Sequence, residues 1–361
     1  MAVQITNYQC PACTGPLHFA GGSGRLECEY CGSTYSVAEI EALYADKEAA
    51  AAAAAESQSA DWNEESVRAY ACPSCGAELL CEATTAATSC PYCGNPTVVP
   101  GQFAGARRPD CILPFRLDKE AAVRALKGHC RKNPFLPRAF TAQHHLEEVK
   151  GVYVPFWLYD ATVDASGTFR AENVSVREEG DYRVSTIMQY EAERSGSVSF
   201  TNVPADGSKK MPDDYMDSIE PFDYSGLQPF STAYLPGFLA DRYDMDAGAC
   251  RNRAESRCKT TAAGLLEADV TGYTAVHREN LRTTVRPDGV RGALLPVWLL
   301  STRWNRKTWL FAMNGQTGKF VGELPVSNGK FWAMTGILTA LFSALAGFSG
   351  IARLVAYVLI S

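Results

Sequence analysis

Residues 10–31 read CPACTGPLHFAGGSGRLECEYC, and residues 72–93 read CPSCGAELLCEATTAATSCPYC. Each stretch holds two Cys-x-x-Cys pairs that are separated by fourteen residues. Structural Zn²⁺ takes four tetrahedral ligands, and each Cys-x-x-Cys turn supplies two of them. The pattern therefore predicts two zinc ribbons, which are small β-structures built around a metal. The eight predicted ligands are Cys10, Cys13, Cys28, Cys31, Cys72, Cys75, Cys90 and Cys93.

Both predicted sites are filled by cysteine alone, which leaves no open position for a catalytic water. We therefore expect two structural Zn²⁺ ions, with iron in a rubredoxin-like site as the alternative. The remaining cysteines follow no metal-ligand spacing, and we interpret them as structural or incidental. They are Cys81, Cys111, Cys130, Cys250 and Cys258.

The composition indicates a folded protein in a reducing compartment. An odd count of thirteen cysteines, eight of them at metal spacing, argues against a secreted disulfide scaffold. The N-terminal residues show no signal peptide pattern. The formal net charge is −6, and two Zn(Cys)₄ sites would take it to about −10. This charge disfavours non-specific binding to nucleic acid, which depends on Lys and Arg.

The chain divides first into ribbon 1 (1–36), a linker (37–65) and ribbon 2 (66–100). The linker includes an unbroken alanine run, Ala49 to Ala55. Because alanine is the strongest helix former, we expect a helix that spaces the two ribbons. A flexible low-complexity linker is the alternative.

Residues 110–328 are predicted to form a mixed α+β domain. Ten-residue segments at 149–158 and 290–299 share the frame V-[KR]-G-x-x-x-P-x-W-L. We interpret them as strands of a duplicated β-rich unit, each followed by a hairpin, with turns at 164–167 and 304–307. A chance match of the two segments is the alternative.

The last segment, 330–361, is predicted to be a transmembrane anchor. Phe331 to Ala352 are 22 residues without a charge, and a helix of that length, about 33 Å, can cross the hydrocarbon core. A buried helix or a short hairpin are the alternatives. Together with reduced thiols, the anchor predicts residence in the inner membrane with most of the chain facing the cytoplasm.

No catalytic constellation is visible. Gly315 to Lys319 resemble a phosphate loop, but the spacing is too short and Phe320 stands where Ser or Thr is needed. We interpret this stretch as a turn between strands. His144 and His145 are adjacent and belong to no His-Glu-x-x-His motif. We therefore expect that the protein is not an enzyme, with an unrecognised activity of 110–328 as a further hypothesis.

The order of these parts resembles the bacterial TFIIB-type zinc-ribbon-containing membrane proteins, which are often labelled primosomal-helicase-like. Five segments carry the resemblance: 72–97, 151–160 (GVYVPFWLYD), 203–221, 234–246 (YLPGFLADRYDMD) and 311–326. The resemblance implies a membrane-stress scaffold whose partners are SPFH/flotillin-like and TPM-domain proteins. The helicase motifs themselves are missing from this sequence.

Two functions follow as hypotheses. The first is a membrane-anchored, cytoplasm-facing scaffold or adaptor that recruits protein partners through its ribbons. The alternative is a zinc-ribbon protein that binds nucleic acid, of the replication or transcription type, without helicase activity.

Overall fold

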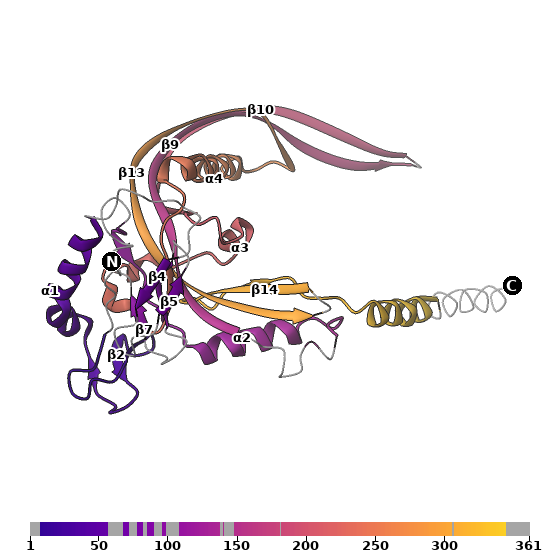
Figure 1. Cartoon of the computed structure of the whole chain (residues 1–361). Coiled ribbons are helices and arrows are strands. Elements are labelled where there is room, and N and C mark those ends of the chain that lie inside the picture. Colours follow the sequence, from indigo (N-terminus) through magenta and orange to yellow (C-terminus); the bar gives the residue numbers. More distant parts are fainter. Residues whose placement is uncertain are drawn as a thin grey trace.

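Long β-strands dominate the computed structural model of the chain (Figure 1). The structure describes residues 8–56, 68–71, 78–81, 85–89, 96–98, 108–137, 140, 148–180, 182–304 and 307–343. Within these ranges lie the helices α1 (Val37–Glu56), α2 (Lys119–Arg131), α3 (Asp213–Ser218) and α4 (Ala247–Ala268), and a further helix covers 328–343. Short 3₁₀ turns lie at Tyr224–Gly226 and Thr232–Tyr234.

The N-terminal cysteine stretch forms a three-stranded antiparallel sheet. Its strands are β1 (Leu17–Ala20), β2 (Arg25–Cys28) and β3 (Thr34–Tyr35). The alanine-rich segment that follows is helix α1. Ser36 caps this helix: its Oγ accepts the N–H of Glu39, and the Glu39 carboxylate accepts the N–H of Ser36 at 2.7 Å. This reciprocal pair is a capping box, which satisfies two N–H groups that the first turn leaves unpaired.

Four short strands lie within 66–100, the range of the predicted second ribbon. β4 (Arg68–Ala71) pairs with β5 (Glu78–Cys81), and β6 (Thr85–Ser89) pairs with β7 (Pro96–Val98). β6 also pairs with β12 (Leu239–Asp241), so this part joins the main sheet. The four predicted ligands Cys72, Cys75, Cys90 and Cys93 lie outside the described residues.

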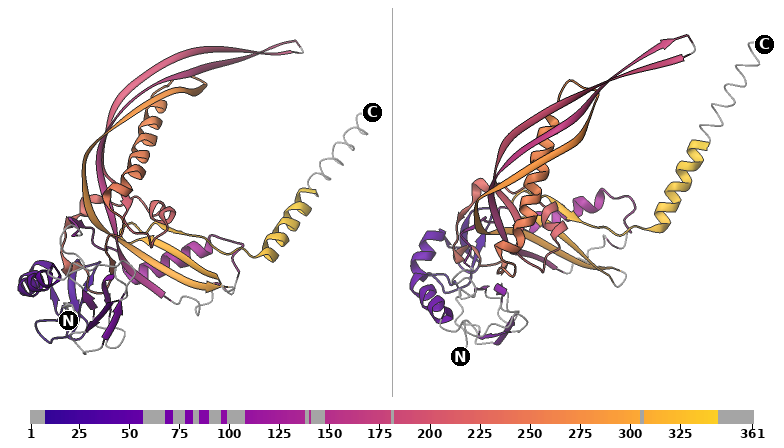
Figure 2. Two further views of the ribbon diagram at one scale, coloured as in Figure 1. Left: turned by 45° about the horizontal axis from the view of Figure 1, so that its top comes forward. Right: turned by 90° about the horizontal axis from the view of Figure 1, so that it is seen from above.

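Among the described residues the main sheet has ten strands, of which three are very long: β9 (Glu148–Glu179), β10 (Tyr182–Asp206) and β13 (Ala275–Trp304). β9 lies between β10 and β13, and all three are antiparallel. They curve around α4 as a half-barrel (Figures 1 and 2). The sheet is completed by β8 (Cys111–Ile112), β11 (Gln228–Pro229), β14 (Lys307–Asn314), β15 (Phe320–Gly322) and the strands β6, β7 and β12.

The two copies of the repeated frame lie on β9 and β13 and pair with each other. Gly151 of the first copy lies opposite Trp298 of the second, and Gly292 lies opposite Trp157. A Cβ added to Gly151 would come within 3.2 Å of the Trp298 ring, and one added to Gly292 within 3.4 Å of the Trp157 ring. Each tryptophan therefore occupies space that glycine leaves free on the facing strand.

The surroundings of the two copies match as well. The indole N–H groups donate to backbone carbonyls: Trp157 to Met245 at 2.9 Å, and Trp298 to Leu117 at 3.1 Å. Just beyond these carbonyls, Asp118 caps α2 and Asp246 caps α4. The glycines that follow the two hairpins donate to the prolines of the frame: Gly207 to Pro155 and Gly315 to Pro296, both at 2.9 Å. The same set of contacts thus occurs twice, related by a local two-fold axis.

Asp206 and Asn314 occupy matching positions at the ends of β10 and β14. Both side chains are buried. Oδ1 of Asp206 accepts the N–H of Ser208, and Oδ1 of Asn314 accepts the N–H of Gln316, each at 2.9 Å. The second polar atom of each side chain has a different environment. Nδ2 of Asn314 donates to two backbone carbonyls, whereas Oδ2 of Asp206 has no hydrogen-bond partner among the described residues.

The fold differs from the sequence-based expectation in two respects within 110–328. The domain is mostly β rather than evenly mixed, because the predicted short strands are parts of three long ones. The turn expected at 164–167 is wrong: these residues lie inside β9. Gly167 is needed there because an added Cβ would come within 2.8 Å of the Asn280 carbonyl oxygen. The first hairpin turns instead between Glu179 and Tyr182.

The predicted transmembrane anchor is contradicted. Residues 328–343 form a helix, and 344–361 lie outside the described residues. In the described part of the chain, no helix combines the length and the apolar character needed to cross a membrane. The placement in the inner membrane, which depended on this anchor, is withdrawn with it.

Candidate metal centre

Two tight turns carry the four cysteines of ribbon 1. In the first turn Thr14 donates its N–H to the Cys10 carbonyl at 2.8 Å, and in the second Gly32 donates to the Cys28 carbonyl at 2.9 Å. Thr14 has φ = 61° and Gly32 has φ = 71°. Glycine adopts this left-handed conformation readily, whereas threonine does so at a cost. The cost at Thr14 indicates that the turn geometry is imposed by the site.

The four sulfur atoms converge on one point. Sγ of Cys10 lies 3.6 Å from Sγ of Cys31, and Sγ of Cys13 lies 3.5 Å from Sγ of Cys28. All four ligand atoms lie within 4.8 Å of one another. In a tetrahedral Zn(Cys)₄ site with bonds of about 2.3 Å, sulfur atoms are about 3.8 Å apart. Cys10, Cys13, Cys28 and Cys31 are therefore close enough to bind one metal ion.

The thiols of the cluster differ in acidity. The pKa of Cys31 falls to about 6, because the hydroxyl and the backbone of Ser33 hydrogen-bond to its sulfur. A backbone hydrogen bond from Gly15 lowers the pKa of Cys13, but the neighbouring thiols of Cys31 and Cys28 outweigh it and raise that pKa to about 12. Four thiolates at this spacing repel one another, and a bound divalent cation removes the repulsion.

One side of the ribbon faces the body of the protein. Cys10 and Cys28 are 1% and 2% exposed, whereas Cys13 and Cys31 face the surface. The hydroxyl of Tyr35 lies 3.5 Å from Sγ of Cys10. Tyr35 and the inner thiols thus form the end of the ribbon core, and the outer thiols lie on the exposed turns.

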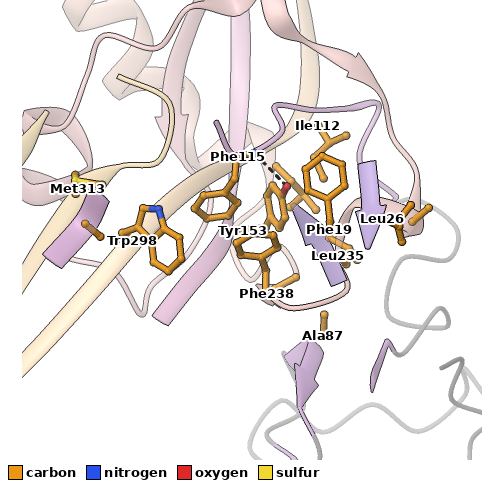
Figure 3. Packing of buried hydrophobic residues seen from close by; sticks show 14 of the residues in the cluster. Phe19, Leu26, Ala87, Ile112, Phe115, Tyr153, Leu235, Phe238, Trp298 and Met313 are labelled. Carbon is orange, nitrogen blue, oxygen red and sulfur yellow. Dashed lines mark hydrogen bonds between the residues drawn. The ribbon is translucent and has the colours of Figure 1, made fainter. Parts of the chain in front are cut away.

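Ribbon 1 is packed firmly on the segment that precedes β12. Phe19 donates its N–H to the Pro236 carbonyl at 2.9 Å, and its ring lies 5.2 Å from that of Tyr234. The Tyr8 and Thr232 hydroxyls hydrogen-bond at 2.6 Å. Figure 3 shows that this contact continues into the core of the main sheet. The core residues drawn there include Phe19, Leu26, Ile112, Phe115, Tyr153, Leu235 and Phe238.

The core beneath the ribbon is largely aromatic. The rings of Phe115 and Phe238 stack at 4.1 Å, and Phe115 also meets the rings of Tyr153 and Trp298 edge-on. The Tyr153 hydroxyl accepts the N–H of Phe115 at 3.4 Å. Burial raises the pKa of Tyr153 far above its usual range. A metal that orders ribbon 1 therefore also supports this core.

The described cysteines outside the cluster lie in packing positions. Cys111, Cys250 and Cys258 are buried, and Cys130 is half-buried. Burial raises the pKa of Cys250 to about 11, which keeps this thiol protonated and unreactive. Cys81 ends β5, and its side chain lies outside the described residues.

Gly315 to Lys319 form a turn between β14 and β15, as the sequence predicts. His144 and His145 lie outside the described residues.

Asp206 and the arginines of α4 were not singled out in the sequence. Arg257 pairs with Glu220, and Arg253 pairs with Asp213 and Asp217 of α3. The acidic pair Asp213–Asp214 opens α3. The one available signal for Asp206 was the similarity of Ala205-Asp206-Gly207 to Met313-Asn314-Gly315 after the two hairpins.

Comparison with known proteins gives one informative relative. No family model matches the chain, and no solved structure is similar to it. The uncharacterized protein YdjG of Bacillus subtilis is 31% identical over 342 residues, which cover 94% of this chain and 96% of YdjG. The chain belongs to the YdjG family. The alignment spans almost all of both proteins.

Proposed function

We propose that this member of the YdjG family is a non-catalytic scaffold, in which zinc-stabilised ribbons recruit protein partners. One observation carries the proposal. Four thiols fill the ribbon 1 site, and the ribbon that they hold is packed on the core of the main sheet. A closed site of this kind stabilises a fold and presents its outer surface.

The metal in this site is proposed to be zinc, because four cysteines at tetrahedral spacing suit it. Cys72, Cys75, Cys90 and Cys93 repeat the same spacing, so we propose that they bind a second zinc ion. Within each site the thiolates would serve as ligands, and the metal would supply structural cross-linking.

The exposed turns of ribbon 1 are the proposed docking surface. Tyr30 is 76% exposed and lies against Gly15 on the outer side of the metal cluster. Residues 8–56 contain seven Asp or Glu residues and two Lys or Arg residues. An acidic surface with an exposed aromatic anchor suits a basic protein surface and repels nucleic acid. The sequence resemblance favours an SPFH/flotillin-like or TPM-domain protein as the partner.

Affinity purification of the tagged full-length protein, with and without nuclease treatment, tests this proposal. We expect a partner of this class to co-purify, and Tyr30→Ala to reduce its recovery by at least tenfold. Leu43→Ala is the matched control, since Leu43 is 59% exposed and belongs to α1, outside the two cysteine turns. Recovery of nucleic acid without a protein partner, or equal recovery with both variants, would refute the proposal.

A further inference from the structure

The β9–β10 hairpin projects beyond the rest of the sheet (Figure 2). β13 begins at Ala275, opposite Glu172, whereas β9 continues to Glu179. Past Glu172 the hairpin therefore has two strands within the described chain. The outer edge of β10 pairs with no strand of the described chain over Tyr182 to Phe200. A two-stranded ribbon is only marginally stable in water unless it is covered or extended.

Apolar side chains are exposed on this projecting part. They are Val174 and Val176 on β9, and Tyr182, Val184, Ile187, Met188 and Tyr190 on β10, all between 39% and 78% exposed. Helix α4 covers the sheet nearer the body, where Cys258, Ala262 and Leu266 pack on Val163 and Phe169. The tip of the hairpin lies beyond that helix (Figure 1). A long, apolar strand edge of this kind is a template for pairing with another strand.

The sequence of β10 is complementary to itself. When two β10 strands are placed antiparallel with Ile187 on the two-fold axis, Arg183 of each lies opposite Glu191 of the other. On the other face Val184 lies opposite Tyr190. The same register brings opposite charges together on one face and apolar side chains together on the other, which are the favourable cross-strand combinations.

In their own hairpin the two charged residues lie opposite residues of unlike charge on β9: Arg183 opposite Glu178, and Glu191 opposite Arg170. Neither Arg183 nor Glu191 forms an ion pair with another described residue, and both are exposed. The edge also has a defined inner limit, because the pairing of β9 and β10 shifts between Phe200 and Val203, where Asn202 has φ = 55°. An unpaired edge from Tyr182 to Phe200 is therefore available, and this register uses Tyr182 to Ala192 of it.

We propose that a second copy of this chain binds here, so that two β10 strands join antiparallel about Ile187 and form one continuous sheet. The proposal does not depend on the metal centre or on the function proposed above. The occupant is a second copy because the charges and apolar residues of β10 match their own reverse order in this register. A partner of other sequence would need to supply the same pattern.

Sedimentation velocity of the full-length protein between 1 and 100 µM tests the proposal. We expect a dimer, and we expect Arg183→Glu and Glu191→Arg each to weaken it about tenfold, because the symmetry places two like-charge pairs in each variant dimer. The double variant Arg183→Glu/Glu191→Arg restores opposite charges and should recover the dimer. Circular dichroism at equal concentration confirms that each variant is folded.

Arg177→Glu is the matched control, since Arg177 lies on the same hairpin but on β9, where it pairs with Glu179. This variant should dimerise as the original chain does. A monomer at every concentration would overturn the proposal. So would a dimer that both single charge reversals leave unchanged, or one that Arg177→Glu weakens equally.

Discussion

Replacing Asp206 with asparagine should make the stability of the protein less sensitive to pH. Asp206 is 1% exposed, and its Oδ2 has no hydrogen-bond partner among the described residues. Burial raises its pKa from 3.8 to about 7. The N–H of Ser208 and the charge of Arg253 on α4 oppose this increase, while Asp213 and Asp244 add to it. The folded protein therefore keeps this proton at pH values where the unfolded chain has released it.

The sign of the effect follows from proton binding. Between about pH 4 and pH 7 the folded form binds more protons than the unfolded form at this site, so the free energy of unfolding falls as the pH rises. At about 1.4 kcal/mol for each pH unit, the full loss approaches 4 kcal/mol above pH 7. An asparagine side chain cannot ionise, so the substituted protein avoids this loss.

Urea unfolding of both proteins at pH 5, 6, 7 and 8, followed by tryptophan fluorescence, measures the effect. Protein and zinc concentrations are held constant, so that pH effects on the metal sites cancel in the difference. We expect the stability of Asp206→Asn relative to the original chain to rise by about 3 kcal/mol from pH 5 to pH 8. An unpaired amide costs the same at every pH, so the slope is the quantity that tests the reasoning.

Asn314→Asp is the reciprocal control. It removes an Nδ2 that donates to the carbonyls of Ile219 and Pro221 and places a carboxylate there. This variant should lose stability, and the loss should grow as the pH rises. A difference between Asp206→Asn and the original chain that does not change with pH would refute the reasoning for Asp206.

Two further predictions concern packing and the metal. Gly292→Ala should lower the free energy of unfolding by about 1–3 kcal/mol, because the added Cβ would come within 2.8 Å of the buried Tyr243 hydroxyl, which hydrogen-bonds to the Phe156 and Ala293 carbonyls. Urea unfolding measures the loss, and Gly196→Ala is the control, since a Cβ added there meets no atom within 4 Å and should leave the stability nearly unchanged. Removing the metal with a chelator should increase hydrogen exchange in residues 232–238, because Phe19 and Tyr8 hold ribbon 1 on that segment; unchanged exchange there would show that the ribbon docks without metal.

The ribbon 1 site could be predicted from local sequence, because Cys-x-x-Cys turns fold by themselves around a metal. The repeated frame also located the two strands whose glycines and tryptophans face each other. The lengths of the hairpins that follow the two copies could not be predicted. A glycine such as Gly167 usually signals a turn, but here it permits the close approach of Asn280 on β13. Strand length depended on that distant partner.

Contacts between distant segments account for the rest. Nothing near Phe19 in the sequence indicates that it packs on Tyr234. The charges that act on the Asp206 carboxyl likewise come from distant residues, among them Asp244 and Arg253. The apolar stretch after Lys330 predicted a transmembrane helix from its composition alone. No helix of the described residues can cross a membrane, and the start of the helix there is tied to the body by the Lys330 ammonium, which donates to the Leu136 carbonyl at 2.7 Å.

The metal content of the purified full-length protein tests the central claim most directly. Inductively coupled plasma mass spectrometry should find two zinc ions per chain, and one in Cys13→Ser/Cys31→Ser, which removes the two outer ligands of ribbon 1. That variant should also unfold at a lower temperature. Iron in place of zinc, or equal zinc content in the original and substituted proteins, would contradict the assignment of Cys10, Cys13, Cys28 and Cys31 as a structural zinc site.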